Sequence, residues 1–516
     1  MSHESGSKTT KPKNIVVCSD GTGNSANKDR GTNVFKLYEA IDLNGHLAPN
    51  TDLIEQIAFY DDGVGTESFK PARILGGAFG WGLGRNVRQL YASLVRSYNR
   101  EDRIFLFGFS RGAFTARTLG GFITSCGILD REQYADDTDL KRAVNKAYEV
   151  YRSRYMVGFN QDIRRRFSRA PSTQESPGAA RSAPRVAKFR EQYAPLGARI
   201  AFIGVWDTVA AIGMPIDHLA DFINYFIYPF KFGDQGLSGL VNRACQAIAI
   251  DDERHTFHPL MWDESDQDHE RISQVWFSGV HSNVGGGYPK QGMSIVALDW
   301  MMSEAAKVGL RFNAADRTYF GEHVNINDML YNSRAGLAVY YRYKPRDIAA
   351  ICRAANTTPK VHESVIDRIR QQTAGYSPGN LPVSMTLVAT GAATTRHPNA
   401  AATVTAAYGT ASSPLERVQF QVRVRRLSHY VFLALSAALA GVLIIPQLSA
   451  ERGIWSIVKA IFTLNENSLV QGFLLHPWLA GSLLALIGAF FALGLVTEER
   501  MARKFSAFWR QVIPKL

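Results

Sequence analysis

A serine between two glycines is the strongest chemical signal in this sequence. Ser110 lies in the segment GFSRG (residues 108–112), directly after the apolar run 104–107 and before an expected helix. In that strand–turn–helix context, G-x-S-x-G is typical of a nucleophile elbow, which leaves the serine hydroxyl exposed at its tip. Gly108 and Gly112 supply space that side chains would fill, because strand and helix backbones come close together there. Ser110 is therefore the candidate nucleophile, and a structural turn serine is the alternative.

Two downstream residues could activate this serine. A serine hydroxyl needs a base, and the base needs an acid that orients it; one known chain order is serine, acid, histidine. Asp207 follows the apolar run 200–205, and His281 follows the run 275–277 in the glycine-rich stretch GVHSNVGGGY. Both are expected at the carboxyl ends of strands, where the catalytic loops of parallel sheets lie. We predict Asp207 as the acid and His281 as the base, with an ordinary loop histidine as the alternative.

Acyl transfer also needs backbone N–H groups that stabilise the developing oxyanion. One is expected from Arg111, because it directly follows Ser110. The other is expected from the segment DGTGN (residues 20–24), which follows an apolar run and contains Gly21 and Thr22. The sequence leaves open which of these two amides takes that role.

No cofactor or metal is required by this chemistry. The four cysteines, Cys18, Cys126, Cys245 and Cys352, are too widely spaced for a CxxC zinc site or a disulfide scaffold, and indicate reduced thiols. Oxygen ligands from Asp20, Asp61 and Asp62 are an alternative that would form a structural metal site. We interpret those carboxylates instead as turn and cap residues at strand ends.

The elements that must position these residues alternate along the chain. Short runs rich in Ile, Val and Phe end in Gly, Asp or Ser, and amphipathic segments such as 33–43 and 86–98 separate them. This pattern predicts an α/β fold, with a mostly parallel sheet and helices on both faces. The five runs that we predict as strands are NIVVCSDG, QIAFYDDG, RIFLFGFS, ARIAFIGVWD and ISQVWFSGV.

A set of motifs in this order resembles one family. SDGTGN, DDGVGT, GGAFGWGLGRNV, LFGFSRGAFTAR, GVWDTV and GVHSNVGGGY are similar to the uncharacterised α/β-hydrolase domain family that includes the catalytic domains of type VI secretion phospholipase effectors. VHESVIDRI and GYSPGNLP extend the resemblance over residues 13–382. It implies a Ser–Asp–His esterase with Ser110, Asp207 and His281 in those roles. Members usually carry an acidic residue two positions after the base, where this chain has Asn283.

Composition and charge point to a membrane. The 516 residues are 46% hydrophobic and 20% charged, which is globular composition and excludes general disorder. The net charge of +12 suits nucleic acid or an anionic membrane surface. Residues 427–448 and 473–496 contain no Asp, Glu, Lys or Arg, and about 20 apolar residues suffice to cross a bilayer. We therefore expect a lipid membrane as partner and no nucleic acid; two buried core helices are the alternative.

Charge also predicts an orientation. Nine basic residues flank the two apolar stretches on one side, and two lie between the stretches, so the positive-inside rule puts the flanks and the catalytic domain in the cytoplasm. The tail that follows has apolar residues at helical spacing among basic ones, which predicts a helix lying at the membrane surface. The nine are Arg417, Arg423, Arg425, Arg426, Arg500, Arg503, Lys504, Arg510 and Lys515, against Arg452 and Lys459.

The domain organisation follows from these patterns. The first residues lack the apolar core of a signal peptide and are expected to be flexible. The predicted order is a flexible N-terminus (1–12), a catalytic domain (13–390) with a mobile loop near 161–188 and an aromatic insertion near 222–232, a linker (391–426) that begins with low-complexity residues 391–413, a transmembrane hairpin (427–496) and a basic amphipathic tail (497–516).

The sequence thus predicts a membrane-anchored, multi-pass serine hydrolase. We expect it to cleave acyl esters, phospholipids in particular, through an acyl-enzyme and without a cofactor. One alternative is a membrane-tethered binding module that retains the fold without catalysis, since fold does not determine function. Another is an esterase or thioesterase for soluble substrates. The sequence does not say whether the protein is a secreted toxin with an immunity partner or a housekeeping enzyme.

Overall fold

The computed structural model describes most of the chain. The described residues are 11–21, 31–49, 51–62, 78–155, 177–209, 236–265, 268–391, 394–408, 413–444 and 466–516. The predicted aromatic insertion at 222–232, most of the predicted loop at 161–188, and Thr22 lie outside them.

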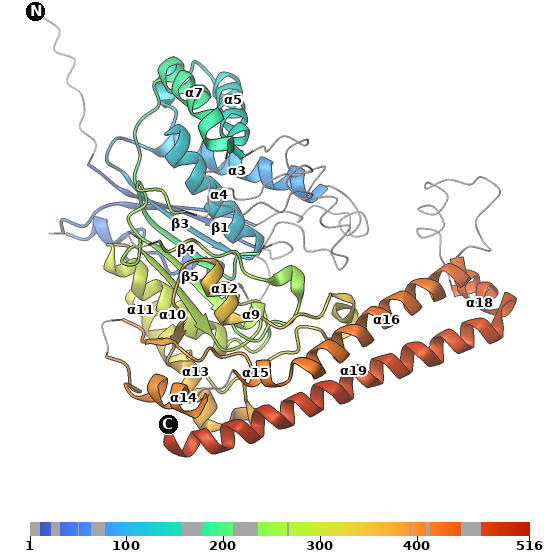
Figure 1. Ribbon diagram of the computed structural model, residues 1–516. Helices are drawn as coiled ribbons and strands as arrows, with labels where there is room; N and C mark the ends of the chain where they lie inside the picture. Colours follow the sequence, from blue (N-terminus) through green and yellow to red (C-terminus); the bar gives the residue numbers. More distant parts are fainter. Residues whose placement is uncertain are drawn as a thin grey trace, which may run out of the picture.

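Eight parallel strands form one sheet at the centre of the molecule (Figure 1). The order across the sheet is β2-β1-β3-β4-β5-β6-β7-β8. The predicted α/β class with a parallel sheet is therefore confirmed. The strands are β1 (Asn14–Ser19), β2 (Gln56–Asp61), β3 (Arg103–Phe109), β4 (Ile200–Trp206), β5 (Ala244–Ala249), β6 (Ile272–Phe277), β7 (Lys360–His362) and β8 (Thr386–Val388).

Alternate side chains of the central strands enter different hydrophobic clusters. On β1, Ile15 and Val17 pack with one layer of helices, whereas Val16 and Cys18 pack with the other. Strands buried on both faces read as continuous apolar runs, which is why the central strands stand out in the sequence. One layer contains α3 (Ala78–Ser97), α4 (Arg111–Cys126), α5 (Asp137–Tyr155) and α7 (Pro177–Tyr193); the other contains α1 (Asn33–Glu39), α10 (Gly292–Lys307) and α11 (Ala314–His323).

Helix α7 corrects part of one prediction. The composition of residues 161–188 predicts a loop, whereas α7 begins at Pro177 and covers the end of that range. Proline is tolerated at the first position of a helix, where its missing N–H is not needed. The Arg, Ala and Gln residues that follow favour helix, so the proline- and serine-rich composition was a poor guide there.

A third cluster corrects the predicted linker. Within 391–413, residues Ala400–Tyr408 form helix α14, and Ala400, Val404 and Tyr408 are buried in a cluster with β7 and α13 (Ser364–Gln371). These three residues are four apart, so they share one helix face. The Ala- and Thr-rich composition concealed this periodicity, and the segment is part of the folded body rather than a free linker.

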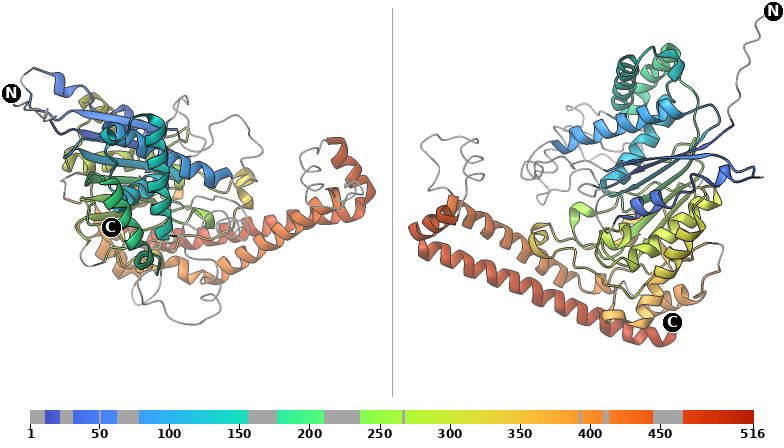
Figure 2. Two further views of the ribbon diagram at one scale, coloured as in Figure 1. Left: turned by 90° about the horizontal axis from the view of Figure 1, so that it is seen from above. Right: turned by 180° about the vertical axis from the view of Figure 1, so that it is seen from behind.

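Two long helices extend from this body side by side (Figures 1 and 2). Helix α16 spans Gln419–Ile444 and α19 spans Pro477–Val512, with α18 (Glu466–Leu475) between them. Both long helices are long and apolar enough to cross a membrane. Their outer apolar side chains are exposed, as Trp478 (89% exposed) illustrates.

The C-terminal tail differs from its prediction. It continues α19 without a break, and its apolar residues face the protein: Trp509 is fully buried and its Nε1 donates to Pro378 O (2.8 Å). Met501 and Val512 are also buried, in two neighbouring clusters. A stripe of apolar residues on a helix fits a protein surface as well as a lipid surface, and here the protein covers it.

Candidate active site

The candidate site lies where the strand order changes direction. From β1 the chain goes to β2 on one side and to β3 on the other, and such a switch point opens a crevice at the carboxyl ends of the strands. Ser110 directly follows β3, Asp207 follows β4, and His281 comes shortly after β6. Three strands thus bring the three predicted residues to one edge of the sheet.

The turn at Ser110 has the backbone expected of an elbow. Ser110 has φ 58° and ψ −119°, a region that L residues rarely occupy. A Cβ on Gly108 would lie 2.4 Å from Gly112 O, and a Cβ on Gly112 would lie 2.0 Å from Ser19 O. Neither position can hold a side chain. The close approach that the two glycines predict is therefore present, and it involves β1 as well as β3.

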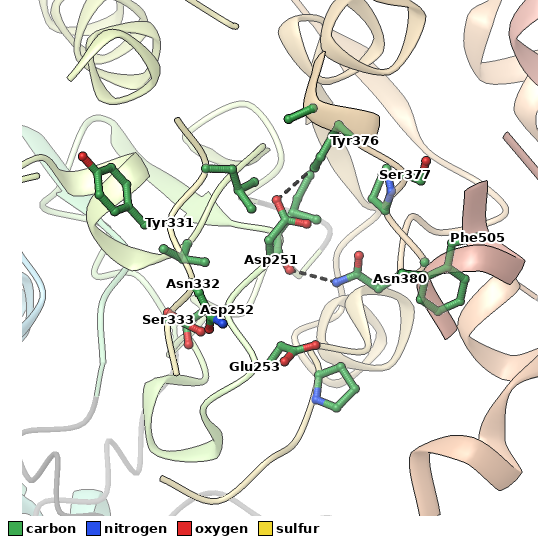
Figure 3. Close-up of a pocket in the computed structure, with 18 of the residues that line it drawn as sticks. Asp251, Asp252, Glu253, Tyr331, Asn332, Ser333, Tyr376, Ser377, Asn380 and Phe505 are labelled. Carbon is green, nitrogen blue, oxygen red and sulfur yellow. Dashed lines mark hydrogen bonds between the residues drawn. The ribbon is translucent and has the colours of Figure 1, made fainter. Parts of the chain in front are cut away.

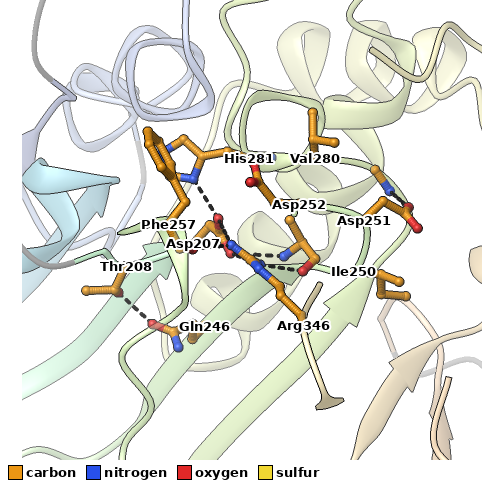
Figure 4. A network of polar contacts seen from close by, with 12 residues as sticks. Asp207, Thr208, Gln246, Ile250, Asp251, Asp252, Phe257, Val280, His281 and Arg346 are labelled. Atoms are coloured by element: carbon orange, nitrogen blue, oxygen red, sulfur yellow. Dashed lines mark hydrogen bonds and ion pairs between the residues drawn. The ribbon is translucent and has the colours of Figure 1, made fainter. Parts of the chain in front are cut away.

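A continuous chain of hydrogen-bond contacts joins the three side chains. His281 Nε2 lies 2.8 Å from Ser110 Oγ, and His281 Nδ1 lies 2.5 Å from Asp207 Oδ2 (the latter pair in Figure 4). A neutral imidazole that donates from Nδ1 to the carboxylate can accept the serine proton at Nε2. His281 opens the short helix α9 (His281–Gly285) instead of lying in an open loop, and its ring is buried.

The charges of the site favour this neutral imidazole. Burial lowers the pKa of His281, and this effect outweighs the opposing effect of its hydrogen bond to Asp207. Burial would raise the pKa of Asp207, but the charge of Arg346 and the hydrogen bonds from His281 and Arg346 bring it well below its usual range. At neutral pH the pair is therefore an ionised carboxylate beside a neutral imidazole that can act as a base.

Arg346 is the residue that sequence reasoning missed. Its Nη1 lies 2.7 Å from Asp207 Oδ1 and its Nη2 lies 2.9 Å from Asp207 Oδ2, and both residues are fully buried (Figure 4). The Ala249 N–H also donates to Asp207 Oδ1 (3.0 Å). Arg346 stands 139 residues from Asp207, in a stretch with no motif or strand before it, so no local signal marks it.

The segment after β5 supports the backbone around His281. The His281 N–H donates to Asp252 Oδ2 (3.2 Å), and the Gly279 N–H donates to Asp251 Oδ2 (2.6 Å). The guanidinium of Arg254 in turn pairs with Asp252 (2.7 Å). The aromatic ring of Phe257 packs edge-on against the imidazole, with centroids 5.0 Å apart. These contacts hold the backbone and the ring of His281 in place. They come from the segment that follows β5, a strand that the sequence did not reveal.

The predicted oxyanion donors differ in whether their N–H groups already have a hydrogen-bond partner. Arg111 is the first residue of α4, and the first N–H groups of a helix are not used by its internal hydrogen bonds. Partial burial of its side chain lowers the pKa of the guanidinium to about 10. The Gly21 N–H donates to Asp20 Oδ1 (2.6 Å), an interaction that competes with an oxyanion role. Thr22 lies outside the described residues.

Two further sequence questions have structural answers. The Asn283 Nδ2 donates to Met329 O (3.0 Å), and its Oδ1 accepts from Val280 N (3.3 Å), so Asn283 joins α9 to a neighbouring loop.

The carboxylate of Asp20 is engaged by two hydroxyl groups: its Oδ2 accepts from Thr32 (2.5 Å) and from Tyr60 (2.7 Å). Within the described ranges, no three His, Cys, Asp or Glu side chains are grouped as a metal site would require.

A cavity of about 630 Å³ borders Asp252 and Arg346, which support the candidate site (Figure 3). Asp251, Asp252, Glu253 and Tyr376 line it from the catalytic body, and Phe505 lines it from the tail of α19. Its lining includes Arg346 but not Ser110, Asp207 or His281. The cavity therefore separates the supporting loop from the tail of α19 and is distinct from the catalytic crevice.

Comparison with known proteins identifies the family of this chain. The uncharacterized protein YEL023C of Saccharomyces cerevisiae is 25% identical over 271 residues, which cover 48% of this chain and 32% of that protein. The match thus spans about a third of the length of that relative. The family model for the catalytic domain of Tle1-like phospholipase effectors of the type VI secretion system matches residues 13–304. That match covers more than half of the chain, including Ser110, Asp207 and His281, and the chain belongs to this family.

Proposed function

We propose that the chain is a membrane-anchored serine hydrolase that cleaves acyl esters of phospholipids. The observation that carries the proposal is the contact chain from Asp207 through His281 to Ser110, with distances of 2.5 and 2.8 Å. The family supports a phospholipase-type hydrolase. The strained elbow, the neutral imidazole and the ionised carboxylate supply what acyl transfer by a serine needs.

In the proposed reaction His281 Nε2 takes the proton of Ser110 as Oγ attacks the ester carbonyl. The resulting oxyanion is stabilised by the N–H of Arg111, which follows the nucleophile at the start of α4. His281 then gives its proton to the leaving alkoxide, and the acyl group stays on Ser110 as an ester. Water deprotonated by His281 attacks this ester, the fatty acid leaves, and the proton returns to Ser110.

The preference for phospholipids over soluble esters rests on the family, whose model describes the catalytic domain of phospholipase effectors.

The anchoring part of the proposal rests on α16 and α19. We propose that residues 13–390 form the catalytic domain and that the apolar stretches within 427–496 cross the bilayer as a hairpin. The exposed apolar side chains of both helices support this, since a soluble protein rarely leaves such a surface uncovered. The excess of basic residues outside the hairpin supports a catalytic domain on the cytoplasmic side.

The hydrolase proposal is tested with the full chain in mixed micelles of detergent and phospholipid. Products from a panel of phospholipids are identified by mass spectrometry for the wild type, for Ser110→Ala and for Ser93→Ala. Ser93 is a control because its hydroxyl contacts Gln89 O on α3, outside the site. We expect fatty acid release by the wild type and Ser93→Ala only. Equal release by Ser110→Ala would refute the assigned nucleophile.

Orientation is tested separately in intact cells. A membrane-impermeant thiol reagent is applied to Ser456→Cys, between the two apolar stretches, and to Gln511→Cys, an exposed position near the end of α19. The proposal predicts labelling of the first position only. Labelling of the second position with protection of the first would reverse the orientation.

A further inference from the structure

We propose that residues 333–341, here called the lipid-contacting segment, enter the bilayer beside the first apolar helix and lead phospholipid from that same bilayer to the active site. The inference deepens the proposed function and rests on its membrane anchoring. The segment includes the short helix η4 (Gly336–Tyr340), between α11 and α12 (Ile348–Ala354).

A cluster of charged residues marks where the polar surface of the hairpin ends. Arg425 of α16 pairs with Glu498 of α19 (2.6 Å) and with Glu253 of the catalytic body (3.2 Å). The uncharged part of α16 begins two residues later, and that of α19 ends at Val496. In an anchored protein this cluster therefore lies at the level of the lipid headgroups, because ion pairs avoid the hydrocarbon.

The lipid-contacting segment is held on the apolar side of this cluster. Arg334 Nη2 lies 3.1 Å from His429 Nδ1, and the rings of Tyr340 and Phe432 lie 5.3 Å apart. His429 and Phe432 are four and seven residues beyond Arg425, which is one to two helical turns at about 5.4 Å per turn. These contacts place the segment within the first turns of the uncharged helix.

The outer face of the segment is apolar. Leu337 is 85% exposed, and Tyr340 beside it is also exposed. Leu427 and Tyr430 of α16 are exposed at the same level, so the segment continues the apolar surface of the hairpin. Tyrosine is typical of the membrane–water interface, where its ring is apolar and its hydroxyl remains hydrated. A lipid bilayer is the occupant that covers all of this surface at once.

A small cavity lies between the segment and the hairpin. Its volume is about 280 Å³, and it is lined by Arg334 and Val339 from the segment and by Phe432, Phe491 and Leu495 from the hairpin. The lining also includes Arg425 and Glu498. Charged groups beside apolar side chains suit a surface that lies between the headgroups and the acyl chains of a bilayer.

The other end of the segment reaches the active site. The ring of Tyr341 packs on Phe257 with centroids 5.5 Å apart, and Phe257 packs on the imidazole of His281. The segment thus extends from the surface of the hairpin to the contact shell of the proposed base. A lipid that follows this route keeps its acyl chains in an apolar environment for most of the way, because the bilayer adjoins the segment.

The test measures the depth of single engineered cysteines in the full chain. The four native cysteines are all buried, so an added exposed cysteine can be labelled selectively with an environment-sensitive fluorophore. The positions are Leu337→Cys, Leu484→Cys in the middle of the apolar stretch 473–496 as the membrane reference, and Leu47→Cys on the catalytic body as the aqueous reference; the last two side chains are also exposed. The proteins are reconstituted in vesicles of phosphatidylethanolamine and phosphatidylglycerol, with and without lipids that carry a quencher on the acyl chain.

We expect quenching at positions 337 and 484 and none at position 47. Quenching at 484 with no quenching at 337 would overturn the inference and leave the anchoring intact. No quenching at 484 would overturn the anchoring and, with it, the inference. The same measurement in the Ser110→Ala background does not depend on catalysis, so its outcome is separate from that of the hydrolase proposal.

Activity supplies a second readout. Leu337→Ser should lower kcat/KM on phospholipid vesicles about tenfold, since the favourable transfer of the exposed leucine from water into the bilayer would be lost. It should leave hydrolysis of a soluble short-chain ester unchanged, and Leu47→Ser should change neither. Equal losses of Leu337→Ser on both substrates would contradict a role in lipid access.

Discussion

Arg346 holds both carboxylate oxygens of Asp207, at 2.7 and 2.9 Å, in a fully buried pair behind the imidazole of His281. The proposed acid of the site is therefore already neutralised by a cation on its far side. In the proposed mechanism, Asp207 therefore acts mainly by orienting His281 and by fixing the tautomer of its imidazole. The pair also raises the pKa of Arg346 above its usual value, against the effect of burial, so the cation is permanent.

Arg346→Met should change the pH profile as well as the stability. Without the cation, the charge of Asp207 favours the imidazolium form, so the pKa of His281 rises and the acid limb of kcat/KM moves to higher pH. In the wild type, burial lowers the pKa of His281, and activity should persist below about pH 6.5. An unpaired buried carboxylate should also cost about 3–5 kcal/mol of unfolding free energy.

Arg346→Lys is the matched control, because it keeps the positive charge but loses the bidentate contact with the Asp207 carboxylate. We expect its acid limb to stay near that of the wild type while kcat falls. The pH profiles are measured with a soluble ester. If Arg346→Met folds and its acid limb coincides with that of the wild type, Arg346 does not act through Asp207.

Buried histidines should make the protein sensitive to mild acid. Burial lowers the pKa of His362 from 6.5 to about 4 in the folded state. Below the unfolded pKa, the unfolded chain binds a proton that the folded chain does not. Stability is therefore present above about pH 6.5 and is lost as pH falls towards 4, by about 1.4 kcal/mol per pH unit.

The measurement is the midpoint of thermal unfolding in detergent at several pH values. His362→Gln should flatten the decline between pH 6.5 and 4, the two pKa values of this group. His323→Gln, at an exposed position on α11, is the control and should leave the decline unchanged. A decline of equal steepness in His362→Gln would show that other groups cause it.

Gly112→Ala should destroy the elbow. The added Cβ would lie 2.0 Å from Ser19 O and 2.5 Å from Asp20 O, so either β1 or Ser110 must move. We expect no activity and a loss of at least about 1–3 kcal/mol of stability. Gly197→Ala is the control, since its Cβ would meet nothing within 4 Å. Activity and unfolding midpoint are compared, and normal turnover by Gly112→Ala would contradict the geometry of the site.

The tail of α19 should contribute to the stability of the folded body. Trp509 is fully buried and hydrogen-bonded to Pro378 O, so Trp509→Ala should cost about 3–5 kcal/mol. Trp478→Ala removes an equally large side chain that is 89% exposed, and should change the unfolding midpoint in detergent little. Similar small effects of both variants would mean that the tail is not docked on the body.

The sequence revealed the parts of the fold that have strong local patterns. The central strands β1, β3 and β4 are buried on both faces and rich in Ile, Val and Phe, so their runs were recognisable. Strand β5 has the sequence ACQAIA, whose apolar pattern is too weak to stand out. Strands β7 and β8 have three residues each and are too short to be recognised. Their pairing depends on neighbours that the sequence does not show.

The candidate site divides in the same way. Ser110, Asp207 and His281 stand out in the sequence because each follows a strong strand and the three come in a known order. Arg346 and Asp252 act through contacts made by distant segments, which leave no local pattern. The tail was predicted to face lipid because its apolar stripe has the same period whichever surface covers it.

The most direct test of the account is labelling of the full chain in detergent with a fluorophosphonate probe, which reacts with activated serines, followed by peptide mass spectrometry. We predict one modified serine, Ser110, and a loss of labelling by at least about 10³-fold in His281→Ala, whose fold remains intact. An unlabelled wild type, a label on another serine, or undiminished labelling of His281→Ala would contradict the central claim.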